Sequence, residues 1–209
     1  MPKPVRIGVI GAGSATFSLG LVKDLCLTEN LKGSAVSFMD IDDDRLDAVA
    51  KMAERYTAEI GSDLRIGHTT DRSAVLQDCD FVINTAAVQS HYHKADMREV
   101  YARHGDYYRA PAGNGFYNFN LMLDVVHDME RICPDAWLIQ SGNPLFDGCT
   151  LMTRETDIKS CGLCHGHYGY AGVARVLGLD PEAVTWQAPG LNHNIWLTDF
   201  IFDTEAASP

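Results

Sequence analysis

The stretch RIGVIGAGSATFS, residues 6–18, decides the fold of this chain. Its apolar start leads into the glycine pair Gly11 and Gly13, and apolar residues at helical spacing follow. Glycines at a strand–helix junction permit a tight turn, and the free N–H groups of the helix start can hold a pyrophosphate. The stretch therefore favours a dinucleotide-binding loop over an ordinary strand–helix turn, although Thr16 stands in place of the third fingerprint glycine.

A second strand-like run, residues 35–39, ends at Asp40. A carboxylate at this place accepts hydrogen bonds from the adenosine ribose and repels a 2′-phosphate. The pattern therefore predicts NAD rather than NADP as the cofactor.

Strand-like and helix-like segments alternate beyond this loop, which predicts βαβ units and a parallel sheet. The expected fold class is α/β: a Rossmann-type doubly wound parallel sheet over residues 1–160, followed at 161–209 by the beginning of a second α+β region for metal and substrate. Because the chain stops directly after a strand-like run at 194–202, we expect the C-terminal remainder of that region to be absent. Expected strands are 5–10, 35–39, 64–68, 80–85, 136–140, 160–164, 185–188 and 194–202, and expected helices are 15–28, 43–60, 94–104, 118–132, 146–154 and 168–177.

Composition excludes several classes of protein. The 209 residues carry a formal charge of −11, which disfavours binding to a nucleic-acid backbone. No apolar run reaches the roughly 18 residues that span a bilayer. The N-terminus lacks the pattern of an export signal. We therefore expect a cytoplasmic protein with neither nucleic-acid nor membrane partners.

The segment Cys161-Gly-Leu-Cys164-His165 has more than one interpretation. It suits a redox pair, half of a zinc site, a single thiolate ligand of a catalytic metal at Cys164, or a purely structural segment. His193 is the natural distant partner for a metal-binding thiolate. The four remaining cysteines stand in apolar surroundings and are expected to be core residues: Cys26, Cys79, Cys133 and Cys149.

Asn143-Pro144 follows the expected strand 136–140. Ligands of open α/β sheets bind at the carboxyl ends of the strands. Asn143 is therefore a candidate ligand-binding residue, and a plain strand-terminating turn is the alternative.

Taken together, these motifs resemble glycoside hydrolase family 4, the NAD- and metal-dependent glycosidases. Within that family, the Cys-His-Gly-His-Tyr form is most similar to the α-glucosidase branch. The matching segments span most of the chain in the family's order: residues 6–18, 39–42, 80–85, 143–146, 164–168 and 190–196.

The resemblance implies an enzyme that cleaves α-glucosides or α-galactosides. NAD⁺ takes a hydride from C3 of the sugar, a base removes the C2 proton, and the leaving group is eliminated from C1. Water then adds back and NADH returns the hydride, while a divalent metal, Mn²⁺ in most members, stabilises the developing enolate. A homodimer or homotetramer is expected. The residues implied for the dinucleotide site are Gly11, Gly13, Ser14, Asp40 and Asn84; those for the metal are Cys164 and His193; and the residue near the sugar is Asn143. His165 directly follows Cys164 and is therefore a further candidate for lining the site.

Two family features do not match this sequence. The catalytic base of the family, a tyrosine, is expected beyond residue 209. The loop that carries the general acid is shortened, which leaves Asp106 as the nearest carboxylate. Two alternatives stay open: an NAD-dependent dehydrogenase of a small hydroxy acid, and a truncated NAD-binding domain without turnover.

Overall fold

The computed structural model describes residues 3–88, 91–105, 115–191 and 194–202. The chain divides into two compact units, Met1–Gly162 and Leu163–Pro209. In the described part, no helix combines the length and the apolar character that crossing a bilayer requires.

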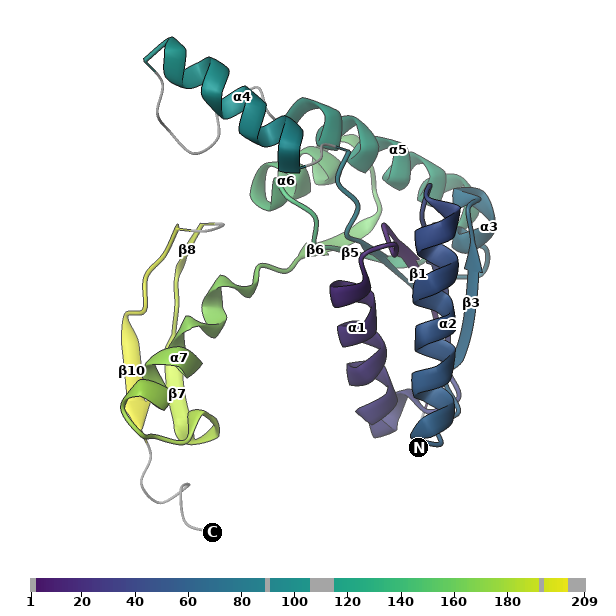
Figure 1. Ribbon diagram of the computed structural model, residues 1–209, viewed down its shortest axis with the longest axis horizontal. Helices are drawn as coiled ribbons and strands as arrows, with labels where there is room; N and C mark the ends of the chain where they lie inside the picture. The colour runs from purple at the N-terminus through teal and green to yellow at the C-terminus, as the bar shows by residue number, and fades with distance from the viewer. Residues whose placement is uncertain (1–2, 89–90, 106–114, 192–193, 203–209) are drawn as a thin grey trace. The chain divides into compact units, whose positions relative to one another are not determined.

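The first unit is built on one six-stranded sheet with the order β3-β2-β1-β4-β5-β6. Figure 1 labels β1, β3, β5 and β6 of this sheet. Every neighbouring pair in this sheet is parallel. The chain builds outward from β1 to β3, crosses back to β4 and continues to β6, which is the order of dinucleotide-binding domains. The predicted Rossmann-type fold is thereby confirmed. The strands are β1 (Arg6–Ile10), β2 (Ala35–Met39), β3 (Arg65–Thr69), β4 (Phe81–Asn84), β5 (Trp137–Gln140) and β6 (Lys159–Gly162).

Helices cover both faces of this sheet. One buried cluster joins α1 and α2 to the sheet through Val22 and Leu46, and the other joins α3, α5 and α6 through Leu76, Met129 and Met152. A helix layer on each face buries both sides of the parallel strands, as such sheets require. The helices are α1 (Ala15–Leu27), α2 (Asp43–Glu59), α3 (Arg72–Leu76), α4 (His91–Arg103), α5 (Phe116–Ile132) and α6 (Leu145–Glu155).

Local sequence fixes where these helices begin. The Asp42 side chain accepts a hydrogen bond from the Arg45 N–H at the start of α2, and Asp71 accepts one from Ser73 at the start of α3. Aspartates at these positions satisfy N–H groups that have no partner within the helix and complement its dipole. The α2 cap lies next to the candidate site, because the N–H of the cap residue Asp42 donates a hydrogen bond to the Asp40 side chain.

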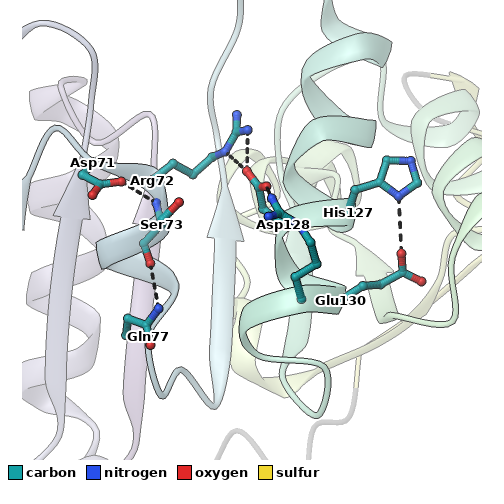
Figure 2. Close-up of polar contacts among 8 residues, drawn as sticks. Asp71, Arg72, Ser73, Gln77, His127, Asp128 and Glu130 are labelled. Carbon is teal, nitrogen blue, oxygen red and sulfur yellow. Dashed lines mark hydrogen bonds and ion pairs between the residues drawn. The ribbon is translucent and has the colours of Figure 1, made fainter.

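An ion-pair cluster on Asp128 joins α3 to α5 (Figure 2). Arg72 Nη2 lies 2.5 Å from Asp128 Oδ2, and Arg131 pairs with the other carboxylate oxygen. The Asp128 side chain is only 12% exposed, so water screens this cluster less than the exposed pairs elsewhere in the chain.

Replacing Asp128 with alanine is expected to lower the free energy of unfolding by about 2 kcal/mol, because two guanidinium groups lose a partly buried partner. Glu99→Ala is the matched control. It removes an exposed ion pair with Arg103, and a change within about 0.5 kcal/mol is expected. Urea denaturation of both variants measures the difference, and equal effects would contradict the stabilising role of the cluster.

The described part of the second unit contains two short antiparallel sheets, one α-helix and two 3-10 helices. β7 pairs with β10, and β8 pairs with β9. Tyr170 stacks on Trp186 with ring centroids 4.6 Å apart, which packs the helix against β7. The elements are the 3-10 helix His165–Tyr168, α7 (Gly169–Val176), the 3-10 helix Pro181–Ala183, β7 (Val184–Gln187), β8 (Gly190–Leu191), β9 (Asn194–Ile195) and β10 (Asp199–Phe202).

The prediction of a single strand at 194–202 is wrong, because the structure divides this run into two strands, β9 and β10. The run changes partner between Ile195 and Asp199. Its first part pairs with β8 and its second part with β7, so residues 196–198 form the connection. Apolar character alone indicated the strand, but the change of partner depends on contacts that local sequence does not contain.

Candidate functional site

The glycine loop after β1 has the close backbone approach that the sequence predicted. Gly11 has a φ of +87°, which favours glycine over every residue with a side chain. A Cβ atom at this position would lie 2.6 Å from both the Cα and the N of Ala86, in the loop after β4. Gly11 therefore allows the loops after β1 and β4 to touch.

Asp40 anchors the same loop to the end of β2. Its Oδ2 accepts the Gly13 N–H at 2.8 Å, and its Oδ1 accepts the Asp42 N–H at 3.1 Å. A Cβ atom on Gly13 would lie 2.7 Å from Asp40 Oδ2, so a side chain there would break this contact. Arg45 adds a further tie, because its Nη2 donates to the Gly13 carbonyl at 3.1 Å.

Ser14 is the N-cap of α1, and its exposed side chain makes no capping hydrogen bond. The first-turn N–H groups therefore have no partner from the cap residue, the arrangement that suits an anion at a helix start. A shallow groove continues along the exposed side of α1 past Phe17 and Leu21. Ser14, Gly13 and Asp40 thus stand together at one end of the sheet.

Asn84 lies deeper than the resemblance implied. Its side chain is 0% exposed, its Nδ2 donates to Gln140 Oε1 at 3.0 Å, and its Oδ1 accepts the Ala86 N–H at 3.2 Å. The Gln140 side chain in turn donates a hydrogen bond to the Gly142 carbonyl oxygen at 2.8 Å, in the loop after β5. These contacts join the loops after β4 and β5, and a place for Asn84 in the dinucleotide site stays a prediction.

Asn143 stands at the carboxyl end of β5, where it is exposed and followed by a cis peptide bond to Pro144. The preceding residue, Gly142, packs against the β4 loop, since a Cβ atom there would lie 2.9 Å from the Ala86 carbonyl oxygen. The loops after β1, β4 and β5 therefore meet around Ala86. Asn143 lies at the same sheet edge as Gly11.

Cys164 is the described member of the predicted metal pair, and it is half-buried at the start of the second unit. The Gly166 N–H donates to its sulfur at 3.4 Å. Gly166 also lies against β9, because a Cβ atom there would approach Ile195 Cδ1 to 2.7 Å. The segment after Cys164 is thus packed on the strand that follows position 193.

Several predicted site residues lie outside what the structure describes. Asp106 and His193 fall outside the described residues, and the described part of His165 is its backbone in a 3-10 helix. Among the described side chains, no group of three or more histidine, cysteine or acidic residues is arranged to hold a metal ion. The sequence analysis did not identify Gln140, Ala86 and Gly142 as residues that join the loops of the site. The available signal was Gln140 itself, a polar residue at the end of the otherwise apolar strand β5.

All six cysteines are free thiols. Cys133 belongs to a buried cluster, and Cys26, Cys79 and Cys149 pack against the two cores, which confirms their prediction as core residues. Burial raises the pKa of Cys79 to about 12 and that of Cys133 to about 11.

Iodoacetamide at pH 8 is therefore expected to modify exposed Cys161 in the native protein and to spare Cys79 and Cys133, because the thiolate is the reactive form. Peptide mapping by mass spectrometry measures the modification at each position. The same treatment in denaturant is the control and should modify all three. Modification of native Cys133 as fast as Cys161 would contradict its burial.

The strand order and the glycine turn after β1 define the class of this chain, a Rossmann-type α/β protein. Within that class it belongs to family 4 of the glycosyl hydrolases, whose family model matches residues 6–179.

Individual relatives carry related names. The chain is 30% identical over 203 residues to an α-galactosidase of Bacillus subtilis, covering 93% of this chain and 47% of that protein. It is 28% identical over 212 residues to an α-glucosidase of Erwinia rhapontici, covering 93% of this chain and 45% of that protein. The chain thus spans about half the length of the curated relatives that it matches.

Solved structures agree on the fold. A 6-phospho-α-glucosidase from gut microorganisms, crystallised with NAD and Mn²⁺, superposes with a TM-score of 0.83 at 21% identity, covering 96% of this chain and 47% of that one. A lactate dehydrogenase from Eimeria maxima superposes less well, with a TM-score of 0.67 at 16% identity over 90% of this chain and 53% of that one.

Proposed function

We propose that this chain acts in the cleavage of α-glycosides, of the α-glucoside or α-galactoside type, with NAD and a divalent metal, Mn²⁺, as cofactors. The observation that carries the proposal is the glycine loop held by Asp40, at the same sheet edge as Asn143. Membership of family 4 supports the glycosidase over other users of a Rossmann fold.

The residues at the sheet edge fit a dinucleotide. Gly11 and Gly13 keep side chains away from the place that a pyrophosphate needs, and Ser14 begins a helix whose first N–H groups face it. Each Asp40 oxygen accepts one N–H within the protein and retains a lone pair for a ribose hydroxyl. The buried Asn84 side chain supports this site by hydrogen bonding to Gln140 and to the Ala86 N–H.

Cys164 and His193 are the proposed metal ligands, and a thiolate with an imidazole suits divalent transition metals. The packing of Gly166 against Ile195 supports this pairing, because it joins the segment after Cys164 to the strand after position 193. His165 is proposed to line the site next to Cys164. Asp106 stays a candidate for the general acid.

Asn143 is proposed to orient the sugar hydroxyls, since it is an exposed amide at the edge where ligands of such sheets bind. When bound, NAD⁺ would accept and later return a hydride at C3 of the sugar, while the metal would draw electron density from the O2 and O3 oxygens.

The test is hydrolysis of p-nitrophenyl α-glucoside and α-galactoside by the purified chain, with NAD⁺ and Mn²⁺ each present or withheld. The expected result is hydrolysis only with both, accompanied by exchange of the C2 hydrogen with solvent deuterium. Hydrolysis that persists after NAD⁺ removal and EDTA treatment would overturn the proposal. NAD binding without hydrolysis would favour a dinucleotide-binding domain without turnover.

A second candidate is an NAD-dependent dehydrogenase of a small hydroxy acid, and the fold shared with lactate dehydrogenase favours it. The two candidates differ in their use of the cofactor. Net NADH that accumulates with lactate or malate would support the dehydrogenase, because the glycosidase regenerates NAD⁺ in every cycle.

The protein is further proposed to act in the cytoplasm as a homodimer or homotetramer, without nucleic-acid or membrane partners. Its free cysteines suit a reducing compartment, and its charge of −11 disfavours nucleic acid. Light scattering after size-exclusion chromatography measures the oligomeric state, and a monomer would contradict the assembly.

A further inference from the structure

Asn118 connects two loops of the candidate site through one side chain. It lies in the first turn of α5 and is only 3% exposed. Its Oδ1 accepts the Val88 N–H at 2.8 Å, and its Nδ2 donates to the Asn143 carbonyl oxygen at 3.0 Å. Val88 belongs to the loop after β4 and Asn143 to the loop after β5.

These two loops leave the sheet where its backbone pairing stops. The last paired residues of β4 and β5 are Asn84 and Gln140. Beyond them, the Asn84 carbonyl oxygen accepts the Ser141 and Gly142 N–H groups at 2.9 and 3.0 Å, and the Asn84 side chain donates to Gln140. Further out, Asn118 bridges the loops at Val88 and Asn143. The separation of the loops is therefore fixed near the sheet by backbone hydrogen bonds and the Asn84–Gln140 contact, and further out by the Asn118 side chain.

We propose that Asn118 is a positioning residue for the reaction. It holds Asn143 at a set distance from the loop after β4, which borders the crevice where a dinucleotide lies in this strand order. Asn118 thereby aligns the sugar bound by Asn143 with the nicotinamide ring. This inference rests on the proposed function, in which Asn143 contacts the sugar.

The chemistry of the two contacts explains the choice of residue. The Val88 N–H needs an acceptor and the Asn143 carbonyl needs a donor, and a single amide supplies both. An aspartate keeps the acceptor for Val88 but places an oxygen against the Asn143 carbonyl. An alanine removes both contacts. Comparing asparagine, aspartate and alanine at position 118 therefore distinguishes the effect of the bond to Val88 from that of the bond to Asn143.

The experiment compares Asn118→Ala and Asn118→Asp with the wild type in the full chain, with Asn120→Ala as the control. Asn120 lies in the same helix but is exposed. We expect kcat for α-glycoside hydrolysis to fall about 10- to 100-fold in both Asn118 variants, since small misplacements of reacting groups have effects of this size. NAD affinity should stay within about twofold, because the variants leave the glycine loop and Asp40 intact.

Hydrogen exchange at the Val88 amide supplies a readout that does not need turnover. Exchange should accelerate in Asn118→Ala and stay slow in Asn118→Asp and Asn120→Ala. Equal exchange in Asn118→Ala and Asn120→Ala would overturn the positioning role, even if the wild type hydrolyses no glycoside. A wild type without hydrolysis would overturn the proposed function and, with it, the role of Asn118 in the reaction, whereas the exchange at Val88 would still decide whether Asn118 bridges the two loops.

Two further outcomes also decide the matter. Wild-type kcat in Asn118→Asp would show that the bond to Asn143 has no part in the reaction. A parallel loss of kcat, NAD affinity and melting temperature in Asn118→Ala would show that Asn118 acts in general packing. Either result overturns the inference.

Discussion

Replacing Cys164 with alanine is expected to lower kcat for α-glycoside hydrolysis at least ~10³-fold, because the site loses its proposed thiolate ligand. Metal ions contribute several kcal/mol of transition-state stabilisation, and about 4 kcal/mol corresponds to a factor of ~10³ in rate. Binding of Mn²⁺ should weaken strongly, whereas NAD affinity should stay unchanged. Titration of Mn²⁺ by electron paramagnetic resonance measures the first, and fluorescence of bound NADH measures the second.

Cys161→Ala is the matched control for Cys164→Ala. Cys161 is exposed in the same Cys-x-x-Cys segment and has no assigned role in metal binding, so activity close to the wild type is expected. An equal loss in both variants would instead favour the redox-pair interpretation of the segment. Full Mn²⁺ affinity in Cys164→Ala would contradict its role as a ligand.

Gly11→Ala is expected to lower the free energy of unfolding by about 2–4 kcal/mol and to weaken NAD binding by ~100-fold or more. Backbone strain at a positive φ and overpacking each contribute roughly 1–3 kcal/mol. The new Cβ atom would lie 2.6 Å from Ala86 backbone atoms, which cannot move as the end of a flexible side chain can. The loops after β1 and β4 must therefore separate.

Gly20→Ala is the control for this substitution. Gly20 lies inside α1, and a Cβ atom there would meet nothing within 4 Å. Alanine at such a helical position is expected to stabilise the protein by about 0.5–1 kcal/mol. Chemical denaturation and NADH titration of both variants give the two quantities. A Gly11→Ala protein as stable as Gly20→Ala would contradict the close approach of the two loops.

The sequence was sufficient to predict the Rossmann-type sheet because its signals are local. The glycine turn, the aspartate after β2 and the alternation of strands and helices each depend on neighbouring residues, and the structure agrees with all three. Gly11 and Asp40 were recognised for the same reason. Their partners in the loop, such as Ala86, were not recognised, because that contact joins segments far apart in the chain.

The amide contacts show where prediction from sequence stops. Asn84 was expected at the surface of the dinucleotide site, yet its side chain is buried against Gln140. The side chain of a polar residue at the end of a buried strand can point outward to a ligand or inward to another amide. The local sequence of the strand does not distinguish these two orientations. The roles of Gln140 and Asn118 follow only from three-dimensional contacts.

The hydrogen bond that Asp40 accepts from the Gly13 N–H in the glycine loop bears on cofactor engineering. Protein engineers who seek NADP use commonly neutralise the acidic residue at the end of the second strand, so that a 2′-phosphate is no longer repelled. In this chain the same exchange, for example Asp40→Ser, also takes an acceptor from the Gly13 N–H and reshapes the turn that should hold the pyrophosphate. In the proposed function, one carboxylate would therefore set both the choice of cofactor and the shape of the loop. A switch of cofactor in this scaffold calls for a new anchor for Gly13 in the same design, and Arg45, already bonded to the Gly13 carbonyl, is the place to begin.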